Sequence, residues 1–222
     1  MTYLQLIDEL YSLQDKEFAL FQTRIVNSKN QKIIGVRTPV LRRLVQEYKN
    51  EYQTLLTFPD EYYEVTFLKL NAVALLPYEN FLPLVKTCVK SIDNWAICDT
   101  FKARCIQKNK ENFLPYIKDF LKGDEFEQRY ALVTLLSFYI EEKYLPLVFE
   151  SIEKSNREPY YTYMASAWLL AEVLVKYYEA GVRFLKQNTL DARTHNKAIQ
   201  KARESFRLTI EQKQTLNALK RK

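Results

Sequence analysis

Phe81-Leu82-Pro83-Leu84 returns as Phe113-Leu114-Pro115-Tyr116 and again as Tyr144-Leu145-Pro146-Leu147. The copies are 32 and 31 residues apart, and Phe184-Leu185-Lys186 is a degenerate fourth copy about forty residues later. Proline is tolerated in the first turn of an α-helix, because its missing N–H would have no partner there. We therefore expect each motif to open the first helix of a repeated unit.

A polar break and a second, more apolar stretch follow each motif. The breaks lie at residues 91–94, 122–124 and 154–157, so the second helices are expected to begin near Trp95, Glu125 and Tyr160. Two helices in a unit of roughly 30–45 residues are typical of HEAT-like and related helical solenoids. The repeats thus predict an all-α fold built from helix pairs.

The flanking segments extend this pattern to both ends of the chain. Residues 2–23 read as one amphipathic helix, and Thr38 is the expected N-cap of a helix with Pro39 at its first position. The polar residues 26–32 between them read as a loop. Residues 191–206 predict a basic helix, and residues 211–222 a closing one. No Gly-, Pro- or Ser-rich linker divides the chain, so we expect one domain over residues 1–222.

Composition narrows the classes of protein that are possible. Only 3 glycines occur in 222 residues, which disfavours sheets and tight hairpins, and 47% hydrophobic with 14% aromatic residues excludes a disordered chain. A net charge of +6 is compatible with a polyanionic partner. The three cysteines (Cys88, Cys98 and Cys105) form no CxxC pair, so we expect reduced thiols, no metal site and a cytoplasmic location. No apolar run reaches the roughly 18–20 residues of a membrane span, and the N-terminus is no signal peptide.

Four residues of the second helices could carry chemistry. Trp95 and Asp99 are four apart, so they share one helix face. Arg129 occupies the next second helix and Trp168 the one after. Stacked repeats place equivalent positions along one concave surface. There, indoles can stack on sugars or bases, a carboxylate can stabilise developing positive charge, and an arginine can hold a phosphate.

Each of these residues also has a purely structural interpretation. Trp168 has apolar neighbours that favour a core position, and Asp99 could be a first-turn partner of its helix dipole. Arg129 could pair with Glu125 on a solvated face. The single histidine, His195, reads as a polar residue at a helix start. The cationic side of residues 191–206 is either solvated or a phosphate contact.

Five ordered elements resemble the AlkD-like DNA alkylation repair proteins, a family built from HEAT-like repeats. They are Gly35-Val36-Arg37-Thr38-Pro39-Val40-Leu41-Arg42, Asn94-Trp95-Ala96-Ile97-Cys98-Asp99, Gln128-Arg129-Tyr130-Ala131, Ala167-Trp168-Leu169-Leu170 and Thr194-His195-Asn196-Lys197-Ala198-Ile199-Gln200-Lys201. The resemblance runs from about residue 8 to the C-terminus. No single element is specific, but the ordered set is.

The resemblance implies a right-handed, C-shaped α-α superhelix that binds double-stranded DNA by its backbone across the concave face. It implies a DNA glycosylase that excises cationic N-alkylated purines, without a cofactor or metal and as a monomer. Asp99 would stabilise the oxocarbenium-like sugar, Trp95 and Trp168 would pack on the deoxyribose, and Arg129 would hold a phosphate. The further DNA contacts that we expect are Arg37, Arg42, Lys197 and Lys201.

Two departures from the family pattern leave alternatives open. Active members carry an aromatic-rich minor-groove helix before the Gly-Val element, whereas residues 25–34 here offer no aromatic wedge. Ala171 stands where active members place an arginine. We therefore predict that the groove residues are present and the reading helix is not. The alternatives to excision are weak, non-catalytic DNA binding and a protein-interaction scaffold.

Overall fold

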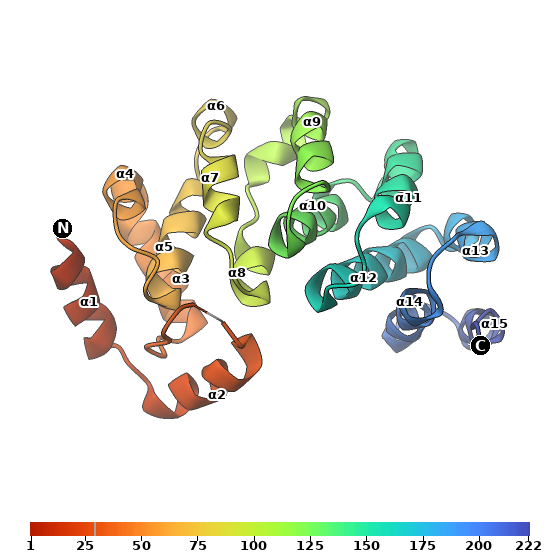
Figure 1. Cartoon of the computed structure of the whole chain (residues 1–222), viewed down its shortest axis with the longest axis horizontal. Helices are drawn as coiled ribbons and strands as arrows, with labels where there is room; N and C mark the ends of the chain where they lie inside the picture. The colour runs from red at the N-terminus through yellow and green to blue at the C-terminus, as the bar shows by residue number, and fades with distance from the viewer. Residues whose placement is uncertain (29) are drawn as a thin grey trace. The chain divides into compact units, whose positions relative to one another are not determined.

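The computed structural model describes residues 1–28 and 30–222, which form two compact units, Met1–Asn109 and Lys110–Lys222 (Figure 1). The described residues contain helices and a single isolated bridge between Lys32 and Tyr62, with no β-strand. The predicted all-α fold of packed helices is therefore confirmed. A single domain over residues 1–222 stays a prediction.

The first unit begins with several short helices that the sequence pattern did not predict individually. Its elements in chain order are α1 (Tyr3–Ser12), α2 (Lys16–Val26), α3 (Thr38–Tyr48), η1 (Lys49–Glu51), α4 (Tyr52–Leu56), α5 (Tyr63–Val73), α6 (Tyr78–Phe81), α7 (Val85–Lys90), α8 (Trp95–Thr100) and η2 (Arg104–Lys108). The central helix α5 packs against α3, α4 and α8. Ten of its eleven residues are buried, so it forms the core of this unit.

The second unit shows the helix-pair repeat most regularly. Its elements are α9 (Lys110–Phe120), α10 (Glu125–Phe138), η3 (Glu142–Tyr144), α11 (Leu145–Lys154), α12 (Tyr160–Lys176), α13 (Tyr178–Gln187), α14 (Ala192–Glu204) and α15 (Ile210–Ala218). The second helices of successive pairs pack on one another, with α12 between α10 and α14. Figure 1 shows α9, α11 and α13 as the other layer of this unit.

The second helices begin where the polar breaks predicted, at Trp95, Glu125 and Tyr160. The break residues explain two of these starts. The side chain of Asn94 accepts a hydrogen bond from the amide of Ile97 at 3.0 Å, which caps α8. Asp124 and Glu127 form a capping box at α10, each accepting from a backbone N–H of the other. These caps supply partners for amides that have none within the helix.

The interpretation of the proline motif as a helix start is correct only for Pro146, which lies in the first turn of α11. Pro83 lies in the turn between α6 and α7, and α6 starts instead after Pro77. Pro115 lies inside α9. That helix begins earlier, at Lys110, whose carbonyl accepts from the hydroxyl of Tyr139 at 2.8 Å. The degenerate fourth copy at Phe184 lies in the second half of α13, not at its start.

The single N-terminal helix expected over residues 2–23 is also wrong, because the chain breaks after Leu13 and restarts at Lys16. Asp15 caps the second helix, α2, by accepting from the amide of Phe18 at 2.9 Å. Its own amide donates to the carbonyl of Gly35 at 3.0 Å. The break between α1 and α2 thus contains a hydrogen bond from Asp15 to Gly35, which is distant in the sequence and which sequence periodicity does not reveal. Thr38 is the first residue of α3 rather than its N-cap, which is Arg37.

A buried carboxylate fixes the Gly-Val element. Glu64 of α5 is 0% exposed and accepts from the amides of Ile34 at 3.0 Å, Gly35 at 2.7 Å and Val36 at 3.3 Å. Burial raises the pKa of Glu64, and the three amides oppose that rise. Gly35 has φ +97°, and a Cβ there would lie 2.5 Å from the Cβ of Ala19. Only glycine therefore allows this segment to lie against α2.

The basic helix expected at residues 191–206 is α14, which ends at Glu204. Phe206, the last residue of the expected helix, lies beyond α14 and is 101% exposed, so the expected end of the helix is wrong. The cause is Ser205, which adopts an extended conformation and ends the helix. After α15 the chain returns to α14: the Nε2 of His195 lies 2.9 Å from the carbonyl oxygen of Leu219.

His195 predicts how stability depends on pH. It is 1% exposed, and burial, with a smaller effect of the Arg221 charge, lowers its pKa below the usual 6.5. The unfolded chain therefore takes up this proton at higher pH than the folded one, so stability is full above pH 6.5 and falls as the pH drops towards the folded pKa. We expect the Tm to fall as the pH drops below about 6.5. His195→Gln, which cannot titrate, should flatten this part of the profile; an unchanged profile would contradict the assignment.

Candidate catalytic residues and nucleic-acid interface

Helix α8 carries both candidate catalytic residues of the first unit. Trp95 is its first residue and Asp99 its next to last, and both are partly exposed. Asp99 is therefore not in the first turn, so the helix dipole does not explain it. A carboxylate is unfavourable near a helix C-terminus, so the dipole of α8 does not stabilise Asp99.

The C-terminal end of α2 is hydrogen-bonded to Trp95. The indole Nε1 donates to the carbonyl oxygen of Ile25 at 2.9 Å. Asp93, just before α8, accepts from the hydroxyl of Ser28 at 2.6 Å and from the amide of Asn30 at 3.1 Å. These three bonds hold the C-terminal end of α2 and the following loop against the start of α8. Lys29 lies outside the described residues.

Helix α2 carries an exposed apolar edge that sequence reasoning missed. Leu20 is 66% exposed, Phe21 56% and Ile25 45%. Ile25 and Val26 of the segment 25–34 belong to the end of α2, whose apolar edge thus reaches into this segment, and its described residues from 27 on are not helical. The absence of a minor-groove helix stays a prediction. The signal was available, since Phe21 and Ile25 are four apart and share a face. Sequence reasoning missed this exposed edge because the periodicity of residues 2–23 predicts a single helix that faces the core.

The arginines of the Gly-Val element have different surroundings. Arg37 is held by Asp15, with its Nε 2.8 Å and an Nη 2.7 Å from the carboxylate, and its guanidinium lies 5.2 Å from the centre of the Phe18 ring. It therefore joins α2 to α3. Arg42 is exposed on α3. Both stay predicted DNA contacts, and Arg37 has a structural task as well.

Arg129 in the second unit is buried rather than solvated. It is 6% exposed, and its Nη1 donates to the carbonyl oxygen of Tyr161 at 3.0 Å. Glu125, one helical turn earlier, accepts from the amide of Tyr161 at 2.6 Å. The backbone of Tyr161 on α12 is thus bound at both polar groups by α10: Glu125 accepts from its N–H, and Arg129 donates to its C=O. The alternative interpretation of Arg129 as a solvated partner of Glu125 is therefore wrong.

Trp168 lies on α12 and is partly exposed, so it is not a core residue. It follows Tyr161 by seven residues, which places both on one face of α12. Trp95 and Asp99 belong to the first unit, and Arg129 and Trp168 to the second. That all four meet on one concave surface stays a prediction.

Two lysines of α14 were predicted as DNA contacts. Both are partly exposed, and the Nζ of Lys197 donates to the Oε1 of Gln200 at 3.1 Å. Lys197 lines a small pocket together with Arg193 and Lys220, whereas Lys201 is not among the lining residues. Sequence reasoning found Lys197 but not its two cationic neighbours.

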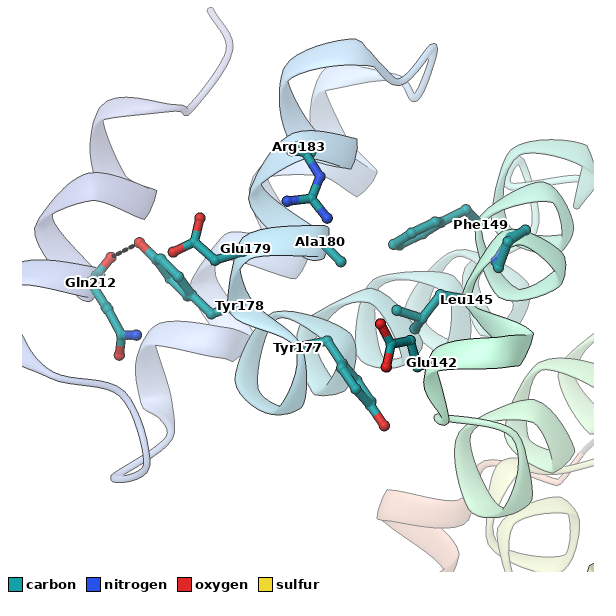
Figure 2. Close-up of a pocket in the computed structure, with 10 residues that line it drawn as sticks. Glu142, Leu145, Phe149, Tyr177, Tyr178, Glu179, Ala180, Arg183 and Gln212 are labelled. Atoms are coloured by element: carbon teal, nitrogen blue, oxygen red, sulfur yellow. Dashed lines mark hydrogen bonds between the residues drawn. The ribbon is translucent and has the colours of Figure 1, made fainter.

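A larger cavity lies elsewhere in the second unit. Figure 2 shows this cavity of about 630 Å³, lined by residues that include Leu145, Phe149 and Tyr177. The hydroxyl of Tyr178 at its edge donates to the carbonyl oxygen of Gln212 at 3.2 Å. None of the predicted site residues lines it. The candidate site residues are therefore separate from this cavity.

The thiols and charged side chains give no sign of a metal site. Cys88, Cys98 and Cys105 are free thiols. Burial raises the pKa of Cys88 to about 12, which makes it a poor nucleophile. Across residues 1–28 and 30–222, no three His, Cys, Asp or Glu side chains are grouped so that they could bind a metal ion. In the same residues no helix has the length and apolar character to cross a bilayer.

A family model described as DNA alkylation repair enzyme matches residues 6–207. The chain belongs to this family. The match runs from α1 through α14 and so includes every predicted site residue, while α15 and the C-terminal tail lie outside it. No curated protein matches the chain significantly. Membership of the DNA alkylation repair enzyme family supports a role in DNA repair, with DNA as the partner.

Proposed function

We propose that this member of the DNA alkylation repair family binds double-stranded DNA and hydrolyses the N-glycosidic bond of cationic N-alkylated purines, such as 3-methyladenine and 7-methylguanine. The observation that carries the proposal is the composition of α8. This six-residue helix presents an indole and a carboxylate, both partly exposed, at Trp95 and Asp99. A carboxylate beside an aromatic ring suits a reaction in which a sugar becomes positively charged.

The reaction needs one carboxylate rather than two. When the bond from C1′ to the purine nitrogen breaks, its electron pair goes to the base, which neutralises the positive charge that alkylation placed there. No general acid is required, unlike ordinary glycoside hydrolysis. Asp99 stabilises the oxocarbenium-like sugar and orients a water molecule. The water oxygen bonds to C1′, and its proton passes to Asp99 and then to solvent.

The other predicted residues bind and position the DNA. Trp95 and Trp168 pack on the deoxyribose of the damaged nucleotide. Arg129 holds a phosphate nearby, and Arg37, Arg42, Lys197 and Lys201 contact the backbone elsewhere. A monomer located in the cytoplasm stays a prediction.

We further assign to α2 the role of the minor-groove helix that residues 25–34 lack. Phenylalanine, leucine and isoleucine are the side chains that proteins insert between base steps from the minor groove. Leu20, Phe21 and Ile25 are all exposed on α2, and the Ile25 carbonyl is bonded to Trp95. The wedge and the candidate catalytic helix therefore lie together in the first unit.

The proposal is tested by excision from alkylated DNA. Duplex DNA treated with a methylating agent is incubated with excess protein, and released bases are identified by mass spectrometry. We expect methylated purines to be released and unmodified bases to stay bound. If excess protein releases no base from DNA that it demonstrably binds, the glycosylase assignment is wrong.

A second candidate function is DNA binding without excision. The burial of Arg129 against Tyr161 favours it, because this guanidinium is already engaged in packing. Under both functions the affinity for undamaged duplex should fall linearly with salt on a double-logarithmic plot, at about 0.9 per phosphate neutralised. Release of methylated purine from alkylated duplex that the protein has bound separates them: excision releases the base, and non-catalytic binding leaves it in place.

A further inference from the structure

The second unit contains a pocket of about 320 Å³ whose charged lining is entirely cationic. Its lining residues are Tyr163, Arg193, Asn196, Lys197, Gln200 and Lys220. They come from α12, α14 and the C-terminal tail. Three of the six are cations and none is a carboxylate. Unscreened like charges of this kind repel one another, and a bound anion relieves that repulsion.

The guanidinium of Arg193 is positioned by its surroundings. It lies 4.2 Å from the centre of the Tyr163 ring. Its Nη2 donates to the carbonyl oxygens of Arg157 and Glu158. A guanidinium has five N–H donors in one plane, so a group held through a single nitrogen keeps donors for an oxyanion.

The C-terminal tail brings the third cation to the pocket. Asn196 donates to the carbonyl of Arg221 at 2.8 Å and accepts from the amide of Arg221 at 2.9 Å. The Arg221 guanidinium donates to the carbonyls of Leu190 and, at 2.8 Å, Asn188. With the bond between His195 and Leu219, these contacts fix the residues on both sides of Lys220.

The remaining side chains complete a site for an oxyanion rather than for an ion pair. Lys197 has a neutral partner, Gln200, and not an acid. The two nearest acids along the chain are engaged: Asp191 by the amide of Thr194 at 2.8 Å and by Arg157 at 3.2 Å, and Glu204 by the side-chain amide of Gln200 at 3.4 Å. The pocket has room for a phosphate group. Three cations on defined backbone positions offer several N–H donors to its acceptor oxygens and attract its negative charge.

We propose that this pocket binds a phosphodiester group of DNA through Arg193, Lys197 and Lys220. The inference rests on the proposed DNA-binding function. It adds Arg193 and Lys220 to the contacts, and it gives a task to the C-terminal tail, which lies outside the family match at residues 6–207. Lys220 can take part only while the tail stays bound to α14.

The experiment compares two triple variants of equal charge. The pocket variant carries Arg193→Gln, Lys197→Gln and Lys220→Gln. The control carries Lys118→Gln, Lys122→Gln and Lys154→Gln, which removes three lysines from another groove of the same unit. Anisotropy with undamaged duplex is measured across a salt series. We expect the pocket variant to bind about tenfold more weakly or worse at low salt, as loss of charged hydrogen bonds predicts, with a salt slope smaller by about 1 per phosphate lost.

The outcomes separate the pocket from the proposed function. If wild type and both variants bind duplex with one slope, the pocket assignment is wrong and DNA binding stands. If wild type binds no duplex, the proposed function fails. Calorimetry with inorganic phosphate then shows whether the pocket binds free phosphate, and either result overturns a DNA contact. The double variant Lys197→Gln/Lys220→Gln keeps Arg193 and its backbone bonds, so weak binding by it cannot be attributed to misfolding around Tyr163.

Discussion

Asp99→Asn is expected to lower the rate of methylated-purine release by about 100- to 1,000-fold, the range for removing one preorganised electrostatic contact from a transition state. The substitution keeps the size and planarity of the side chain, removes its charge and replaces one acceptor oxygen by an NH2 donor. Because the carboxylate acts on the positive charge that develops on the sugar, the loss should appear in the single-turnover rate and not in DNA affinity. The measurement is single-turnover release of methylated base with excess protein.

The matched control is Asp8→Asn, the same chemical change at an exposed position of α1. It should leave the single-turnover rate within about twofold of wild type, as expected of a surface substitution remote from the site. Equal rates for Asp99→Asn and wild type would remove Asp99 from the chemistry. A loss of duplex affinity equal to the loss of rate would show instead that Asp99 acts in binding.

Glu64→Ala is expected to destabilise the first unit by about 3 kcal/mol or more. It leaves the buried amides of Ile34, Gly35 and Val36 without their acceptor, and each unsatisfied buried group costs about 1–3 kcal/mol. The chain has 2 tryptophans, Trp95 and Trp168, one in each unit. Denaturant unfolding followed by fluorescence in a Trp168→Phe background therefore reports the first unit, and in a Trp95→Phe background the second.

The control for this variant is Glu61→Ala. Glu61 pairs with Lys32 at 2.8 Å, but both side chains are largely exposed. Exposed ion pairs contribute at most about 1 kcal/mol to stability, so the denaturant midpoint of Glu61→Ala should lie close to that of the protein without the substitution. Glu64→Gln should be intermediate, because the amide keeps one acceptor oxygen and turns a donor towards another donor. A Glu64→Ala protein as stable as Glu61→Ala would show that the Gly-Val element does not depend on the buried carboxylate.

The second helices could be predicted from sequence because their start signals are local. Asn94 and Asp124 lie within three residues of the amides that they cap, so a polar break before an apolar run reveals them. The first helices could not be placed in this way. Proline at the start of α11 and proline inside α9 occur in copies of the same tetrapeptide motif, so the motif alone does not place the helix start. The first residue of α9, Lys110, contacts Tyr139, which is distant in the sequence.

The site residues were predicted by type and order, but their surroundings were not. The partner of Arg129 is a backbone carbonyl 32 residues away, and no spacing rule within a helix shows it. The cationic pocket was missed for a similar reason: Lys220 reaches α14 only through the return of the tail. The edge of α2 was missed for another reason, since reading residues 2–23 as one helix hid the change of direction at Asp15.

The hydrogen bonds of Glu125 and Arg129 with Tyr161 couple phosphate binding to the packing of α10 against α12. The guanidinium predicted to hold a phosphate also joins two neighbouring repeats through the Tyr161 carbonyl. A phosphate that draws Arg129 away from that carbonyl must weaken the contact between α10 and α12. A phosphate that binds Arg129 while the hydrogen bond to the carbonyl is kept must strengthen this contact. Because linked equilibria are reciprocal, duplex binding then changes the local opening free energy of α10 and α12 by the same amount that this contact changes duplex affinity.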